Sequence, residues 1–242
     1  PSFPVMARGR HDLGPETSWS LSATLKVDQD WLKSEVSVYG SYIDDYIYLA
    51  PELRDDGTVR TDVLIQGRFP RFNYNAINAI YYGFDAEVQT RMGPIELGVD
   101  GSIVRARDVD EDSFLLFIPP DRIGTEITYH LPEFKSVKDS FISVNLSVIA
   151  RQYSVAPESD FAPVPDGYAL IGASAGTTFE WNNQRYLFSV ETQNVLNTRY
   201  RDYTSLLRYF ADEPGRQVFV RLGTEFGFHP ESTAEQPGAD GV

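Results

Sequence analysis

Apolar and polar residues take turns along most of this chain. Between residues 17 and 27, Trp19, Leu21 and Leu25 fall at odd positions, while the even positions hold three serines, a threonine and a lysine. A period of two is typical of a β-strand whose two faces meet different surroundings. The same alternation recurs over residues 34–49, 74–91, 95–107, 123–131, 142–151, 167–181, 186–193 and 217–228. It predicts an all-β fold of about nine antiparallel strands and no helix.

The gaps between these segments alternate in length. Short gaps fall at residues 28–33, 92–94, 132–136 and 182–184. Long gaps fall at residues 50–73, 108–120, 154–166 and 198–215. Bacterial outer-membrane barrels have short periplasmic turns and long extracellular loops, so this parity predicts transmembrane β-barrel strands over residues 17–228.

A soluble antiparallel sheet, such as a sandwich or adhesin module, is the alternative, because its half-buried strands alternate in the same way. Two features favour the membrane barrel instead. Several predicted strands reach a dozen residues or more, whereas a strand in a globular protein usually has about 5–6. A sandwich also has no reason to place its long and short gaps in strict turn.

The parity of the gaps also predicts an orientation. The last strand runs from a long gap toward the C-terminus, which places that end in the periplasm, and residues 1–16 become an extracellular loop segment. Residues 229–242, rich in Pro, Gly, Glu and Ala, are expected to form a disordered periplasmic tail. About nine strands beginning outside cannot close without an open edge, so we expect the remaining strands to come from a separate chain or a removed segment.

Composition narrows the function. A formal net charge of −14 argues against binding nucleic acid, whose phosphates favour a basic surface. The chain has no cysteine and 3 histidines, so no structural metal site and no cofactor is predicted. Its 14 tyrosines and 15 phenylalanines suit the aromatic girdles of a barrel. The motifs G-x-S-x-G and H-E-x-x-H, the P-loop and the Rossmann fingerprint are all missing, so we do not expect an enzyme.

Three segments carry a family resemblance. Residues 194–203 (NVLNTRYRDY) resemble the N-L-F/L-N-x-x-Y-R-D-Y segment of TonB-dependent outer-membrane receptors, which ends the penultimate strand and opens the last extracellular loop. Residues 206–216 (LLRYFADEPGR) continue that match. Residues 9–18 (GRHDLGPETS) resemble the family's N-x-x-L-x-P-E-x-S segment, and residues 82–87 (YGFDAE) its Y-x-G-x-E-x-E strand motif. Their order and spacing extend the resemblance over residues 9–228.

The resemblance implies that this chain is the C-terminal portion of a 22-stranded transmembrane β-barrel, incomplete on its own. Such receptors lie in the bacterial outer membrane, among lipid and lipopolysaccharide, and hold an N-terminal plug inside the barrel. They import scarce nutrients, usually metal chelates, and an inner-membrane TonB complex pulls on the plug. We therefore expect import of a siderophore, haem or a metal ion, with the plug and the remaining strands as partners.

Two further expectations follow from the resemblance. The family's final aromatic residue serves as an assembly signal, which corresponds to Phe228, although residues 229–242 follow it here. The alternative to transport is a structural outer-membrane component that scaffolds a larger assembly.

Basic residues and tyrosines at the expected outer mouth suit an anionic ferric chelate. The candidate ligand-binding residues are Arg8, Arg10, His11, Asp12, Arg199, Arg201, Tyr203, Arg208 and Tyr209. His11 has a second interpretation, as part of a metal or haem site. For the whole set, loop packing and contact with lipopolysaccharide are the alternative.

Overall fold

A computed structural model describes residues 6–8, 13–65, 67–156, 160–182 and 184–224. Nine long strands dominate: β2 (Thr17–Gln29), β3 (Leu32–Pro51), β5 (Gly67–Met92), β6 (Ile95–Asp108), β8 (Arg122–His130), β9 (Val137–Ile149), β10 (Tyr168–Trp181), β11 (Gln184–Gln193) and β12 (Gln217–Thr224). Three short strands accompany them: β1 (Met6–Arg8), β4 (Thr61–Leu64) and β7 (Ser113–Phe114). The 3-10 turn η1 (Leu206–Tyr209) is the helical element among the described residues, and no helix there is long and apolar enough to cross a membrane.

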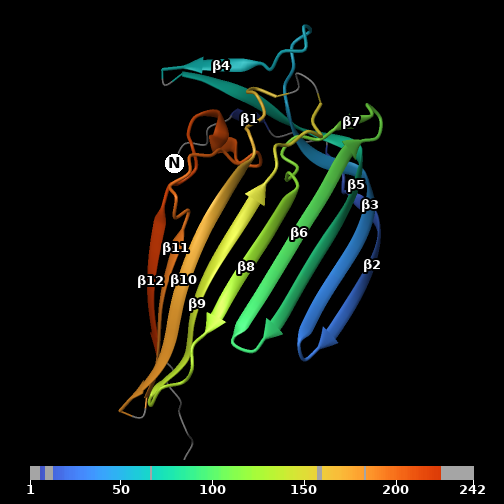
Figure 1. Ribbon diagram of the computed structural model, residues 1–242. Coiled ribbons are helices and arrows are strands. Elements are labelled where there is room, and N and C mark those ends of the chain that lie inside the picture. Colours follow the sequence, from blue (N-terminus) through green and yellow to red (C-terminus); the bar gives the residue numbers. More distant parts are fainter. Residues whose placement is uncertain (1–5, 9–12, 66, 157–159, 183, 225–242) are drawn as a thin grey trace, which may run out of the picture.

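The nine long strands form one curved antiparallel sheet (Figure 1). Their order is β12-β11-β10-β9-β8-β6-β5-β3-β2, so each strand pairs with its neighbours among the long strands in sequence. Long connections gather at one end of the sheet and short turns at the other (Figure 1). The all-β prediction, the nine strands and the alternating connections are therefore confirmed. Within the described residues, β2 and β12 are the edges of the sheet, and they do not pair with each other.

One face of the sheet is apolar from edge to edge. The registers carry apolar residues across neighbouring strands: Val144 of β9 stands opposite Ile127 of β8 and Ala173 of β10. Large side chains on this face are open to solvent, for example Leu21 at 81% and Leu222 at 72% exposure. A contiguous apolar surface of this extent is unusual on a soluble protein and suits lipid. We call it the apolar face.

The opposite, polar face carries hydroxyl, carboxylate and arginine side chains. Ser143 donates from Oγ to Glu126 Oε1 at 2.5 Å, and Arg221 Nη1 lies 2.6 Å from Glu191 Oε2. Some neighbours fit because a glycine stands directly across: a Cβ on Gly83 would lie 2.4 Å from the Tyr39 ring. This face therefore combines hydrogen-bonding groups with close cross-strand packing, as expected of a surface that faces water or a polar partner.

The first long connection is more ordered than the sequence indicated. Residues 50–73 were expected as a loop, but β3 continues to Pro51 and β5 begins at Gly67. A register shift between Ile43 and Tyr46, with Asp45 at φ 53°, moves the alternation by one step. The extended strands then carry the β4–β5 hairpin beyond the rest of the sheet (Figure 1).

A small core stabilises the extended part. Ala79, Ala106, Leu115 and Ile118 are buried together, and the Tyr48 hydroxyl accepts a hydrogen bond from the Leu116 backbone N–H at 2.7 Å. This core joins β5 and β6 to the connection that follows β6. The base of the long-connection end is therefore a packed structure.

The expected terminal segments are only partly described. Residues 6–8, within the expected loop segment 1–16, form β1, which pairs in parallel with β5. Residues 229–242 and Phe228 lie outside the described residues, so the tail and the assembly signal stay predictions.

The two faces make opposite predictions for a charge added to β9. Leu146 is on the apolar face and Ser147 on the polar face. In the full-length protein in lipid vesicles, we expect Leu146→Lys to lower the free energy of unfolding by about 2–4 kcal/mol, because lysine is costly in hydrocarbon. Ser147→Lys is the matched control and should change it by about 0.5 kcal/mol or less. Denaturant unfolding measures both, and the reverse order would show that the faces are assigned wrongly.

Candidate functional site at the long-connection end

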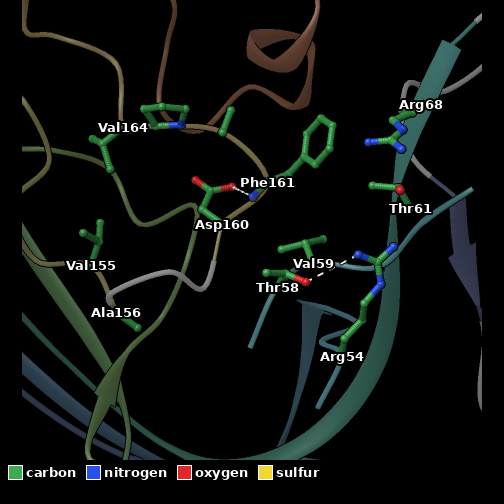
Figure 2. Close-up of a pocket in the computed structure, with 12 residues that line it drawn as sticks. Arg54, Thr58, Val59, Thr61, Arg68, Val155, Ala156, Asp160, Phe161 and Val164 are labelled. Atoms are coloured by element: carbon green, nitrogen blue, oxygen red, sulfur yellow. Dashed lines mark hydrogen bonds between the residues drawn. The ribbon is translucent and has the colours of Figure 1, made fainter. Parts of the chain in front are cut away.

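A pocket opens between two of the long connections. Its volume is about 670 Å³, and one wall comes from the β3–β5 segment while the other comes from the β9–β10 connection (Figure 2). The lining residues are Arg54, Thr58, Val59, Thr61, Arg68, Val155, Ala156, Asp160, Phe161, Ala162, Pro163 and Val164. Two arginines and one aspartate are the charged members of this set.

Arg54 and Arg68 stand on the same wall of the pocket. Figure 2 shows both guanidinium groups on the side facing Asp160 and Phe161. Arg54 Nη1 donates to Thr58 Oγ1 at 3.4 Å, a long hydrogen bond that leaves most of the guanidinium available. Among the described residues, no hydrogen bond or ion pair engages the Arg68 guanidinium. Guanidinium groups match carboxylate, phosphate and other oxyanions.

The β3–β5 segment folds back as a hairpin, which is why the two arginines share a wall. Gly57 has φ 81°, and Asp56 Oδ1 accepts a hydrogen bond from the Thr58 N–H at 3.0 Å. An Asp-Gly turn of this kind reverses the chain tightly. The returning strand β4 pairs with the start of β5, where Val63 stands opposite Arg68.

Asp160, on the other wall, is bound by groups that lie behind the pocket. Its Oδ2 lies 2.6 Å from Arg208 Nη2, while its Oδ1 accepts a hydrogen bond from the Tyr209 hydroxyl at 2.7 Å. The Phe161 N–H also donates to Oδ1, at 2.7 Å. Both carboxylate oxygens of Asp160 are thus occupied within the wall.

Aromatic rings pack around this pair. The Arg208 guanidinium lies over the rings of Tyr203 at 4.6 Å and Tyr209 at 4.7 Å. Tyr209 in turn stacks on Phe72 of β5, with ring centroids 6.5 Å apart. Burial raises the pKa of Tyr203 to about 12 and also raises that of Tyr209, so both phenols stay neutral at physiological pH.

The β11–β12 connection owes its shape to residues of the family-like segment. Asn194 and Asn197 have φ 50° and 55°, a conformation that asparagine tolerates well. Asn194 Oδ1 accepts from the Thr198 N–H at 2.8 Å, and Asn197 Oδ1 accepts from the Arg216 N–H at 3.0 Å. The two asparagines therefore close the turns at the start of this connection and join its two ends.

Asp202 ties the same connection to the start of β10. Its Oδ2 accepts from the Tyr168 hydroxyl at 2.7 Å, and its Oδ1 accepts from the Thr204 N–H at 2.7 Å. Burial alone would raise the pKa of Asp202, but the hydrogen bonds from Thr204 and Tyr168 hold it below its usual value. The charged form of Asp202 is therefore the one that this clamp requires.

The candidate ligand-binding residues predicted from the sequence differ in exposure and in position relative to the pocket. Arg208 and Tyr203 are buried at 2% and 3% exposure, and Tyr209 is half-buried, directly behind the wall that carries Asp160. Arg201 is exposed; it binds Asp212 and donates to the Arg208 carbonyl at 2.8 Å. Arg199 is exposed.

The remaining candidates lie near the first strand. Arg8 lies on β1, where its backbone pairs with Asn73, while Arg10, His11 and Asp12 fall outside the described residues. None of the candidates that the structure describes lines the pocket. A role in ligand binding stays a prediction for all nine residues, and for Tyr203, Arg208 and Tyr209 the contacts favour support of the pocket wall.

Arg54, Arg68 and Asp160, which do line the pocket, were missed at the sequence level. The signal available was the Asp56–Gly57 turn, which folds Arg54 back against Thr58 and predicts a hairpin inside the long gap. Nothing local connects Asp160 with that hairpin. Among the described residues, no group of three or more His, Asp or Glu is placed to hold a metal ion.

Replacing Asp202 tests the clamp on the β11–β12 connection. Asp202→Asn removes charge-assisted hydrogen bonds and should lower the local opening free energy of this connection by about 1–2 kcal/mol at neutral pH. In the wild-type protein the pKa of Asp202 is depressed, so its contribution is present above the unfolded value of about 3.9 and is lost as pH falls through the folded pKa. Hydrogen exchange of the backbone amides measures both effects.

A control variant separates the clamp from a general effect of charge. Asp212→Asn removes only an exposed pair with Arg201, so we expect little change in exchange. Equal exchange in both variants, or an acid-induced loosening that persists in Asp202→Asn, would contradict the clamp.

Comparisons with known proteins agree with the sequence resemblance and the fold. The family model described as "TonB dependent receptor-like, beta-barrel" matches residues 1–224. No curated protein matches the sequence significantly. Among solved structures, the copper transporter OprC is 16% identical with a TM-score of 0.68, covering 89% of this chain and 33% of its own. The siderophore receptor PirA of Acinetobacter baumannii is 17% identical with a TM-score of 0.60, covering 89% and 32%.

A third structure gives the same result. BauA, the ferric preacinetobactin receptor of Acinetobacter baumannii, is 14% identical with a TM-score of 0.63, covering 88% of this chain and 30% of its own. The chain thus spans about a third of the length of these structures, and at such identities the likeness concerns the fold. The family model, by contrast, covers every described residue, and this chain belongs to the TonB-dependent receptor-like β-barrel family.

Proposed function

We propose that this chain forms the C-terminal part of the barrel of an outer-membrane receptor that imports a metal as an anionic chelate. The pocket with two arginines at the long-connection end carries the proposal. Asp160, the one carboxylate among the described lining residues, is already bound by Arg208 and Tyr209, so Arg54 and Arg68 determine what the pocket attracts. Family membership and the likeness to a copper transporter and to siderophore receptors support import as the activity.

The orientation belongs to the same proposal. Long loops of outer-membrane barrels are extracellular, which places the pocket on the side from which a nutrient arrives. The short turns and the end of β12 then face the periplasm. Arg199 and Arg201, exposed on the neighbouring β11–β12 connection, are the described candidates from the sequence best placed for a first contact with the ligand.

Three parts of the sheet have partners under this proposal: its free edges, its polar face and its apolar face. The free edges of β2 and β12 pair with the remaining barrel strands, because lipid does not accept an open edge. The polar face encloses the plug, through which the TonB complex supplies energy. Outer-membrane lipid and lipopolysaccharide cover the apolar face. Within the part of the chain that the structure describes, nothing specifically favours the scaffolding alternative.

Uptake by the native bacterium tests the transport proposal. Cells that lack the gene, starved of iron or copper, are supplied with radiolabelled ferric tris-catecholate, ferric tris-hydroxamate or copper. We expect the deletion to abolish uptake of at least one metal source and the intact gene to restore it. Unchanged uptake of every source would contradict import of a metal chelate.

Substitution of the pocket arginines tests the site. We expect the double variant Arg54→Gln/Arg68→Gln to weaken binding of an anionic chelate by about tenfold or more, because each charged hydrogen bond contributes about 1.5–3 kcal/mol. Arg60→Gln is the matched control: it lies on the same segment, pairs with Glu52 at 3.3 Å and does not line the pocket. Equal binding by the double variant and the control would place the ligand elsewhere.

A further inference from the structure

Arg208 is the most deeply buried charged side chain that contacts the pocket wall. Its side chain is 1% exposed and that of Asp160 is 10% exposed. Separating a buried pair by removing one partner leaves an uncompensated charge, which is far more costly than losing an exposed ion pair. The position and charge of Asp160 therefore depend on Arg208.

The surroundings of Arg208 require a guanidinium. Nη2 binds Asp160, but Nε and Nη1 are buried without a hydrogen-bond partner in the described structure. Aromatic faces surround the group instead: the Phe117 ring lies 5.4 Å away, beyond the nearer rings of Tyr203 and Tyr209. A planar, weakly hydrated guanidinium stacks on such rings, whereas an ammonium loses more hydration.

The same side chain connects three of the long connections. Arg208 lies in η1 of the β11–β12 connection, Asp160 in the β9–β10 connection and Phe117 in the β6–β8 connection. The backbone of Arg208 is held as well, because Arg201 Nη1 donates to its carbonyl. One cation thus fixes the pocket wall from behind.

Arg208 also affects the net charge of the pocket lining. Among the described residues, the lining of the pocket carries Arg54, Arg68 and Asp160, a net charge of +1. Arg208 lies behind the wall and compensates Asp160, so this carboxylate of the lining does not oppose the two arginines. Without Arg208, the Asp160 carboxylate would be an uncompensated negative charge on the wall opposite the two arginines.

We infer that Arg208 is a specificity-determining residue of the pocket: it holds the Asp160 carboxylate in the wall and cancels its charge, so that the pocket accepts anions. Arg208 itself does not touch the ligand; it is a positioning residue that acts through Asp160. The inference deepens the proposed function and rests on it for its biological meaning, while the electrostatic claim stands on the geometry alone.

This chain has no cysteine, so a thiol introduced into it can report the charge in the pocket, with the receptor that lacks the introduced thiol as the blank. Ala162→Cys introduces a thiol into the lining of the complete receptor in outer membranes. The thiol reacts with an anionic sulfonate-bearing and a cationic ammonium-bearing methanethiosulfonate of similar size. The ratio of the two rates, anionic over cationic, reports the local potential without any knowledge of the natural ligand.

The two rates are compared in three variants of the Ala162→Cys receptor. The comparison shows whether Arg208 compensates the charge of Asp160 or only supports the structure. We expect Arg208→Gln to lower the rate ratio about three- to tenfold, because it exposes one negative charge near the thiol. Asp160→Asn should leave the ratio equal or higher. Arg208→Gln/Asp160→Asn should recover most of the loss, although the hydrogen bonds of the pair are gone. Ser113→Cys, on the β6–β8 connection outside the pocket, is the control position.

The outcomes are distinct. An unchanged ratio in Arg208→Gln, or a double variant as low as Arg208→Gln, would overturn the inference and leave Arg208 a merely structural residue. Folding of each variant is checked by heat-modifiable migration in electrophoresis, and the double variant keeps the test decisive if Arg208→Gln assembles poorly. Binding of a trianionic ferric tris-catecholate should follow the same order of variants. If the wild-type receptor binds no chelate, the proposed function fails while the rate ratio still decides the inference.

Discussion

The rest of this structure depends on one constraint: each backbone N–H and C=O group of a membrane-crossing strand needs a hydrogen-bond partner in a neighbouring strand. In hydrocarbon an unpaired N–H or C=O costs several kcal/mol, so a strand can cross only if it is paired on both sides. The register of β3 against β5 accordingly runs without a break from Leu32 to Ile43, and that of β5 against β6 from Met92 to Ala79. Because the backbone polar groups are used in hydrogen bonds between strands, the two faces of the sheet differ only in their side chains. One face carries apolar side chains, which suit lipid, and the other carries polar side chains.

Other rules hold beyond the membrane-spanning part. The bulge after Ile43 is the first break in the β3–β5 register; the ladder resumes from Tyr46 to Pro51, and individual contacts then hold the long connections together. The Tyr48 hydroxyl, the Asp202 carboxylate and the Arg208 guanidinium each join segments that are far apart in the sequence. Such contacts do not follow the regular repeat of a β-sheet. They hold the long connections in an irregular arrangement that forms a pocket.

This difference explains what the sequence could predict. Strand positions follow from a local period of two, so the segments around Trp19 and Leu146 were recognised within a few residues of their observed bounds. The site depends on long separations: Asp160 and Arg208 are 48 residues apart, and nothing near either residue indicates the other. Arginine is rarely buried, so the default expectation for Arg208 was an exposed ligand contact. Its burial among aromatic rings could be found only in three dimensions.

The overall charge of the chain makes local compensation more important. With a formal net charge of −14, the chain does not attract anions from a distance. Salt screens exposed charges beyond about 8 Å at physiological ionic strength, so the acids of the polar face have little influence inside the pocket. Under the proposed function, an anionic ligand is selected by the charges that it meets at contact distance, which among the described residues are Arg54, Arg68 and Asp160. At that range a single carboxylate would oppose half of the positive charge, and the pairing of Asp160 with Arg208 removes this opposition.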